Sequence, residues 1–158
     1  MIRPILTHPD PILREISIPV PAVTEATLAL LDDMLETMYQ AEGRGLAAVQ
    51  IGVLQRVAVV DTDWKQGERN PLFFVNPTIT WSSETMTARE EGCLSIPNQP
   101  RTVKRPERVK VSYLDRNGVD RVTELDGMLA MVIQHEIDHL DGVLILDHVT
   151  PSQPDPIT

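Results

Sequence analysis

The sequence predicts an α+β fold, in which antiparallel or mixed β-sheets surround a central buried helix. Three observations predict this class. Residues 128–140 are apolar nearly all round, as expected of a helix that packs on a sheet. Residues 25–42 carry apolar side chains at helical spacing on one side only, which predicts a second, amphipathic helix nearer the N-terminus. Short segments of β type, including one strong hairpin signal, lie between the two helices.

The elements follow in order along the chain. Five prolines between residues 4 and 21 predict an extended, turn-rich lead-in. Thr24 is a suitable N-cap for the amphipathic helix, which Gly43 and Gly45 should interrupt. Residues 56–61 and 72–77 are expected to form strands, as are 109–114 and 119–124 on either side of Asn117-Gly118, a dipeptide that tolerates the positive φ angles of a tight turn. Residues 143–146 are a candidate for one more short strand.

The length and composition indicate one domain. A chain of 158 residues can bury a core without staples, and it contains no repeat or break in composition, so we expect a single catalytic domain over 1–150 and a Pro-rich, flexible tail over 151–158. A single cysteine makes an internal disulfide impossible.

Charge and hydropathy argue against nucleic acid and membranes as direct partners. The formal net charge is −9 and the pI is near 4.8, which opposes attraction to either surface. Neither a secretory signal nor an uncharged apolar run of membrane-spanning length is present, so a cytoplasmic location is expected. A local basic cluster at 101–110 is interpreted as the solvated face of an edge strand.

The second helix carries a metal-binding pattern, Gln134-His135-Glu136-Ile137-Asp138-His139. On a helix, residues i and i+4 share a face, so both imidazoles can bind one ion beside the carboxylate of Glu136. Catalytic sites of this kind use three protein ligands and keep one position open. The sequence therefore predicts a metal-activated hydrolase with a third ligand elsewhere.

Downstream residues supply no convincing third ligand. No glutamate follows Glu136, position 145 is isoleucine where another hydrolase group has a third histidine, and the aspartates at 141, 147 and 155 are weak substitutes. His148 is interpreted as an ordinary surface histidine. Upstream, Cys93 lies in Glu91-Gly92-Cys93-Leu94-Ser95, beside a glycine that permits close approach. A thiolate and two imidazoles form a sound three-ligand set.

With these residues the chain resembles the peptide deformylases, from about Ile5 to about Val149. That family is marked by three motifs in fixed order, which here are Gly43-Arg44-Gly45-Leu46-Ala47-Ala48-Val49-Gln50, Glu91-Gly92-Cys93-Leu94-Ser95 and Gln134-His135-Glu136-Ile137-Asp138-His139. The resemblance implies hydrolysis of the formyl group on the N-terminal formylmethionine of newly made polypeptides, with release of formate.

The resemblance also implies a role for each motif. Cys93, His135 and His139 would bind the metal, and Glu136 would act as general base. The Gln50 side chain and the Leu94 backbone N–H would stabilise negative charge on the carbonyl oxygen. The residues implied in substrate binding are Gly43, Arg44, Gly45, Glu91, Met128, Met131 and Val132. Ferrous iron (Fe2+) is implied as the physiological ion, and ligand softness also permits Zn2+, Ni2+ or Co2+.

Two departures from the family pattern modify these expectations. Arg44 stands where many members have an aliphatic residue, which predicts altered side-chain preference with the chemistry retained. No basic C-terminal helix of the kind that docks many bacterial members on the ribosome follows residue 150, so weak or no ribosome docking is expected.

Two other functions compete with deformylation. A zinc endopeptidase would need the missing downstream ligand and would leave the Cys93 motif without a purpose. A metal-stabilised protein that binds methionine-like N-termini without turnover would be expected to show a broken catalytic position, whereas Gln50, Cys93, Glu136 and both histidines are present.

Overall fold

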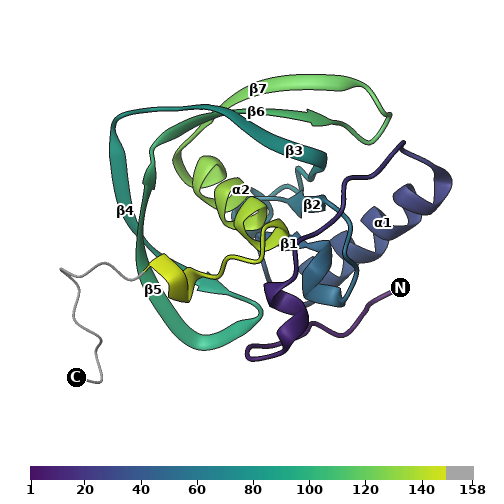
Figure 1. Ribbon diagram of the computed structural model, residues 1–158, viewed down its shortest axis with the longest axis horizontal. Coiled ribbons are helices and arrows are strands. Elements are labelled where there is room, and N and C mark those ends of the chain that lie inside the picture. The colour runs from purple at the N-terminus through teal and green to yellow at the C-terminus, as the bar shows by residue number, and fades with distance from the viewer. Residues whose placement is uncertain (149–158) are drawn as a thin grey trace.

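The computed structural model describes residues 1–148 and has the predicted α+β architecture. The expected tail at 151–158, and with it the expectation about ribosome docking, lies outside the described residues. In Figure 1, helix α2 (Gly127–Leu140) occupies the middle of the molecule, with strands above it and on one side and helix α1 (Glu25–Gln40) on the other. The central helix therefore carries its histidines in the interior.

The strands form two sheets, and all their pairings are antiparallel. The larger sheet has the order β1-β2-β3-β6-β7 and the smaller is the β4-β5 pair. The strands are β1 (Gly45–Ala47), β2 (Val57–Val60), β3 (Leu72–Ser82), β4 (Met86–Cys93), β5 (Ile96–Pro106), β6 (Arg108–Leu114) and β7 (Asp120–Asp126). Because β1 stands at the end of the larger sheet, one of its edges has no partner strand among residues 1–148.

Both helices begin where the sequence indicates. The Thr24 hydroxyl accepts the Thr27 backbone N–H at the start of α1, and the buried face of that helix packs Leu31, Met34 and Met38 into a core under β1 and β2. Helix α2 starts directly after β7, without a side-chain cap, and ends before Gly142, whose φ of +75° suits glycine. Its apolar residues pack on β2, β3, β6 and β7 in a second core.

Several boundaries differ from the prediction. Strand β3 runs to Ser82, five residues beyond its predicted end, across two register irregularities that a simple alternation pattern does not reveal. Around the predicted hairpin turn only Gly118 has a positive φ, because the turn is a longer loop closed by the Asp115 side chain.

The predicted strand at 143–146 is wrong. The chain forms a short 3-10 helix at Ile145–His148, in which the Asp147 side chain accepts the Leu144 N–H and the Asp147 N–H donates to the Leu144 carbonyl. Leu144 and Ile145 are buried in a small core with Leu13. A short apolar run is compatible with a strand or a buried turn, and here the capping aspartate decides in favour of the turn.

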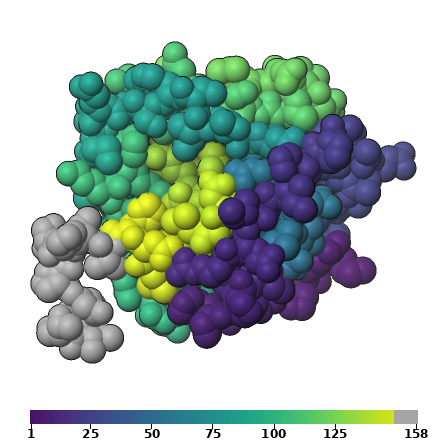
Figure 2. All heavy atoms as spheres, viewed as in Figure 1, coloured from purple at the N-terminus to yellow at the C-terminus, as the bar shows by residue number. Residues whose placement is uncertain are grey.

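The N-terminal segment lies across the outside of the site-bearing segments. Figure 2 shows residues near the N-terminus, in purple, beside the yellow residues that follow α2, and the Arg14 guanidinium pairs with the Asp147 carboxylate there. Leu6 N donates to the Gln50 carbonyl at 2.7 Å and His8 N donates to the Ser95 carbonyl at 2.8 Å. Within the described residues, none of the helices has the length and apolarity needed to cross a membrane.

Candidate metal centre

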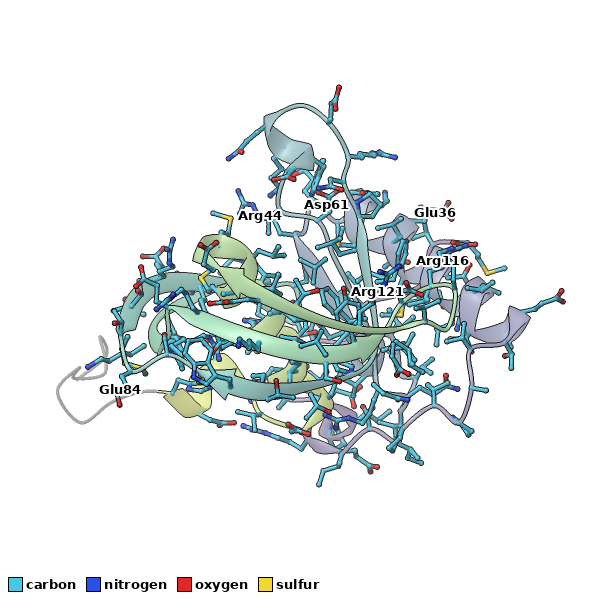
Figure 3. The ribbon with its side chains drawn as sticks, turned by 90° about the horizontal axis from the view of Figure 1, so that it is seen from above. Glu36, Arg44, Asp61, Glu84, Arg116 and Arg121 are labelled. Carbon is cyan, nitrogen blue, oxygen red and sulfur yellow. The ribbon has the colours of Figure 1, made fainter. Side chains whose placement is uncertain are left out.

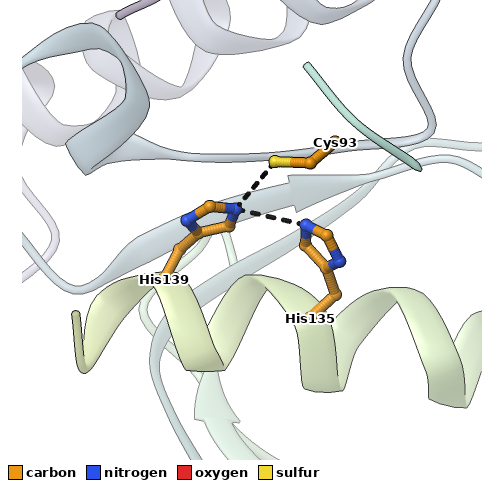
Figure 4. A group of neighbouring side chains, drawn as sticks. All are labelled: Cys93, His135 and His139. Atoms are coloured by element: carbon orange, nitrogen blue, oxygen red, sulfur yellow. Dashed lines mark hydrogen bonds between the residues drawn. The ribbon is translucent and has the colours of Figure 1, made fainter. Parts of the chain in front are cut away.

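The two histidines of α2 face one another one helical turn apart. Their Nε2 atoms are 3.1 Å apart, and both rings are buried, with His139 only 1% exposed. The Cys93 sulfur lies 3.2 Å from His139 Nε2. Figure 4 marks this contact, and the contact between the two histidines, by dashed lines. Cys93 comes from the end of β4, so the central helix and the smaller sheet meet at this point.

The geometry of these three residues fits a metal ion. One donor atom from each of Cys93, His135 and His139 lies within 4.8 Å of the other two. Facing imidazole nitrogens repel one another unless a proton or a cation lies between them. Burial lowers the pKa of His139 well below its usual value, while contacts with Cys93 and Glu91 outweigh burial and raise the pKa of His135 to about 10. A cation bound between these atoms would remove the repulsion, and one thiolate with two imidazoles suits a divalent transition metal.

An ion pair behind His135 sets the orientation of its ring. Glu91, 2% exposed, contacts His135 Nδ1 at 3.0 Å and accepts two hydrogen bonds from Arg105, at 2.7 and 3.0 Å. Burial opposes ionisation of Glu91, but the hydrogen bonds from His135 and Arg105 prevail and lower its pKa. An ionised Glu91 holds the Nδ1 side of the His135 ring, so Nε2 faces Cys93 and His139.

Arg105 also belongs to a larger hydrogen-bonded group that includes Asp138 of α2 and His148 in the segment after it. Arg105 donates to Asp138 at 2.8 Å, and His148 Nε2 contacts the same Asp138 oxygen at 2.8 Å. Arg105 is thus buried and paired. The interpretation of residues 101–110 as a solvated face is therefore wrong at this residue, because β5 turns the Arg105 side chain inward on the same face as the buried Val103. His148 is likewise part of a hydrogen-bonded group, in contrast to the ordinary surface histidine that the sequence indicated.

Glu136 projects into the cavity beside the histidines. Its side chain is 3% exposed, and Oε1 has no hydrogen-bond partner among the described residues. Burial raises the pKa of Glu136 to about 7. A carboxyl group with that pKa and a free oxygen can take a proton and give it back near neutral pH.

Gln50 is oriented by its neighbours. Its Oε1 accepts the Ala47 backbone N–H at 2.9 Å, so Nε2 is the atom that faces the site. One contact of Nε2 is the Ser95 hydroxyl, at 3.0 Å, and another is the Cys93 sulfur, at 3.8 Å. The amide can therefore offer a hydrogen to an oxygen atom near the sulfur.

Leu94 is the first of the two turn residues that join β4 to β5. In a tight turn the closing hydrogen bond comes from the last residue, so the N–H of the first turn residue is not part of the ladder. The Leu94 side chain packs against Gly43 of the first motif, because a Cβ added to Gly43 would lie 2.6 Å from Leu94 Cδ1.

A cavity of about 350 Å³ opens next to the cluster. Of the sequence-predicted substrate residues, Gly43, Arg44, Gly45, Glu91, Met131 and Val132 line it, together with Gln50, Cys93, Leu94, His135 and Glu136. Met128 lies one turn earlier on α2 and packs on the second core instead. The buried His139 is not among the described residues that line the cavity.

Other residues at the cavity carried no motif in the sequence. Its mouth includes Lys65 from the loop after β2, and Asn98 and Gln99 from the start of β5. The Asn98 backbone has a φ of +63°, an irregularity that asparagine tolerates better than most residues. No spacing rule relates these residues to the three motifs, so the sequence alone did not single them out.

A cluster of one partly buried thiol and two buried imidazoles, with a carboxylate beside a cavity, defines a metal-dependent hydrolase. The profile of the Polypeptide deformylase family matches residues 2–155, nearly the whole chain. The chain belongs to the polypeptide deformylase family.

Curated relatives carry the same assignment. The chain is 48% identical over 149 residues to a peptide deformylase of Rhizobium meliloti (strain 1021), covering 94% of this chain and 86% of the relative. It is 51% identical over 152 residues to a peptide deformylase of Methylocella silvestris, covering 94% and 78% of the two chains.

Solved structures agree with the fold. A probable peptide deformylase from Synechococcus phage S-SSM7 has a TM-score of 0.89 and 41% identity, covering 93% of this chain and 99% of that one. A peptide deformylase from Legionella pneumophila has a TM-score of 0.89 and 44% identity, covering 96% of this chain and 88% of that one.

Proposed function

We propose that this protein removes the formyl group from the N-terminal formylmethionine of newly made polypeptides and that Cys93, His135 and His139 hold the required metal ion. The observation that carries the proposal is the convergence of these three donors beside Glu136 Oε1, which has no hydrogen-bond partner within residues 1–148. A divalent ion held there supplies a Lewis acid that polarises the formyl carbonyl and lowers the pKa of water.

The chain's own residues complete the reaction. Glu136 takes a proton from the attacking water, which adds to the formyl carbon, and the carboxyl group then returns that proton to the departing amine. While negative charge develops on the carbonyl oxygen, the Gln50 amide, whose Nε2 faces the Cys93 sulfur, and the Leu94 N–H donate to it. Formate and a free N-terminal amine are the products.

The free edge of β1 is the proposed binding place for the peptide. An extended substrate can add to this edge as a further strand, with main-chain hydrogen bonds that are independent of sequence. Met131 and Val132 on α2 offer apolar contacts for the methionine side chain. A related enzyme from Acinetobacter baumannii, 34% identical with a TM-score of 0.88, has been solved with Met-Ala-Ser bound, a peptide of the product type.

The chemistry of the three donor atoms and of the substrate also suggests which metal ion is bound and in which compartment the enzyme works. The donor set suits Fe2+, which we propose as the physiological ion, and it also accepts Zn2+, Ni2+ or Co2+. The substrate is a nascent polypeptide and Cys93 must remain a thiolate, so we place the enzyme in the reducing cytoplasm.

Formate release from formyl-Met-Ala tests the proposal. Protein prepared without oxygen and loaded with Fe2+ should release formate, and the Glu136→Gln variant should lose the activity while still binding the metal. Absence of formate with the loaded wild-type protein would refute the proposed function. An unformylated longer peptide serves as the parallel substrate, and its cleavage would indicate an endopeptidase instead.

A further inference from the structure

The loop between β2 and β3 is attached to the free edge of β1 through one indole. Trp64 Nε1 donates a hydrogen bond to the Gly43 carbonyl at 2.9 Å. Gly43 lines the cavity just before the start of β1. Trp64 does not belong to the cavity lining found in the described part of the chain, although its neighbour Lys65 does.

The loop itself is anchored by a buried carboxylate. Asp61 is 1% exposed and accepts four hydrogen bonds: from the Tyr39 hydroxyl at 2.5 Å and from the backbone N–H groups of Asp63, Trp64 and Asn70 at 2.8–3.2 Å. The Trp64 ring packs edge-on against Tyr39, with ring centroids 5.3 Å apart. Trp64 is therefore held by contacts with Tyr39 of α1 and with Asp61.

The segment that Trp64 holds needs support. It begins at Glu42, a non-glycine residue with a φ of +60°, and continues through Gly43, where a side chain would collide with Leu94. Gly43 N donates to the Met38 carbonyl at 2.9 Å and Asp61 N donates to the Arg44 carbonyl at 2.8 Å. The indole satisfies the remaining Gly43 carbonyl and so determines the plane of the Gly43-Arg44 peptide group. Figure 3 shows Arg44 and Asp61 near one another beside this loop.

We propose that Trp64 is a positioning residue for the substrate: through the Gly43 carbonyl it aligns the free edge of β1 for pairing with the formylated peptide. The inference rests on the proposed function. Backbone alignment at this edge affects the peptide equally in the ground state and in the transition state, which makes it uniform binding. Glu136 and both histidines belong to α2, whereas the indole donates to Gly43, so the chemical step is preserved.

The Trp64→Phe variant tests the inference because it removes the N–H donor and keeps an aromatic ring against Tyr39. Loss of one hydrogen bond predicts a rise in KM for formyl-Met-Ala-Ser of about two- to tenfold, with kcat within about twofold of wild type. Amide hydrogen exchange should accelerate at 43–45 and remain unchanged at 57–60 in β2.

The chain provides a matched control, because its other tryptophan, Trp81, is 41% exposed on β3. Trp81→Phe should leave KM, kcat and exchange at 43–45 unchanged. An unchanged KM in Trp64→Phe, or a fall confined to kcat, overturns the inference while the proposed function stands. If wild-type protein releases no formate, the proposed function fails. The positioning role of the Trp64 contact is then still tested by amide hydrogen exchange, because unchanged exchange at 43–45 in Trp64→Phe would refute it.

Discussion

The backbone of Gly45 lies against the Glu136 carboxylate, with no room for a side chain between them. A Cβ added at Gly45 would overlap Glu136 Oε2 and would lie 2.7 Å from Val132 Cγ1. A glycine in the first motif is thus required by the position of the Glu136 carboxylate in the third. This contact also limits where Glu136 can point, because one of its oxygens faces the strand while Oε1 remains free of partners within residues 1–148.

Gly45→Ala should therefore reduce activity through Glu136. The added methyl group displaces the carboxylate, and a displacement of about 1 Å near the reacting atoms can cost about 100-fold in kcat/KM. Metal content should remain that of wild type because Cys93 and both histidines are not touched. Steady-state kinetics together with metal analysis check this, and a wild-type kcat/KM in the Gly45→Ala variant would contradict the close contact.

Glu91→Gln should weaken metal binding. Glutamine cannot offer His135 an ionised acceptor, and loss of such a partner typically lowers metal affinity about 10–100-fold. Competition with a chromophoric chelator measures the affinity directly. The comparison variant is Glu90→Gln at the neighbouring exposed position, for which no change in affinity is expected. Equal affinities for the two variants would mean that Glu91 does not orient His135.

Arg105→Met should destabilise the fold much more than an arginine change at the surface. It leaves Glu91 and Asp138 without their cation, and breaking a buried ion pair costs about 3–5 kcal/mol. Denaturant unfolding at neutral pH measures this loss. Arg121→Met, which breaks the exposed pair with Asp115, is the matched control and should have a much smaller effect. Equal losses in the two variants would show that burial of the Arg105 pair contributes nothing.

The sequence predicted the helices well because their signals are local. Thr24 marks the start of α1, and the all-round apolar pattern of α2 requires its burial. The ion pair between Glu91 and Arg105 was not predictable in the same way. It depends on the register of β4 against β5, in which Glu91 lies opposite Arg101 and Arg105 lies opposite Thr87, so the long Arg105 side chain reaches Glu91 diagonally. Alternation of side chains gives a strand its faces but not its register.

The residues of the site likewise fall into those that the sequence predicts and those that it does not. The histidines and Glu136 follow from helix geometry, and Cys93 could be reached by excluding other ligands and by resemblance. Trp64 and Lys65 reach the site through a loop whose conformation depends on the four hydrogen bonds to Asp61, and three of these come from backbone groups that carry no sequence signature. Met128 illustrates a related limit, since helical spacing alone does not distinguish a cavity wall from the core one turn away.

Removal of the metal should lower thermal stability as well as activity. A ligand that binds only the folded state stabilises it by about 2.7 kcal/mol at a concentration about one hundred times its Kd. Calorimetry with and without a chelator measures the shift in Tm. His139→Ala should show no metal-dependent shift, whereas His8→Ala, at an exposed histidine outside the cluster, should retain it. A chelator-dependent shift of wild-type size in His139→Ala would exclude the cluster as the binding site.

Arg44→Ile should change substrate preference and leave the chemistry intact. The Arg44 side chain is half-buried at the cavity mouth and forms no ion pair with any residue in the range 1–148, so it is available to a bound peptide. A cation at that place favours peptides with an acidic residue after the formylmethionine, because Coulomb attraction is strengthened where water is partly excluded. Across a series of formyl-Met peptides with acidic, neutral and basic residues at the next two positions, the variant should show a higher KM for the acidic members alone, with a common kcat. Identical kinetic constants for wild type and Arg44→Ile over the whole series would remove Arg44 from substrate recognition.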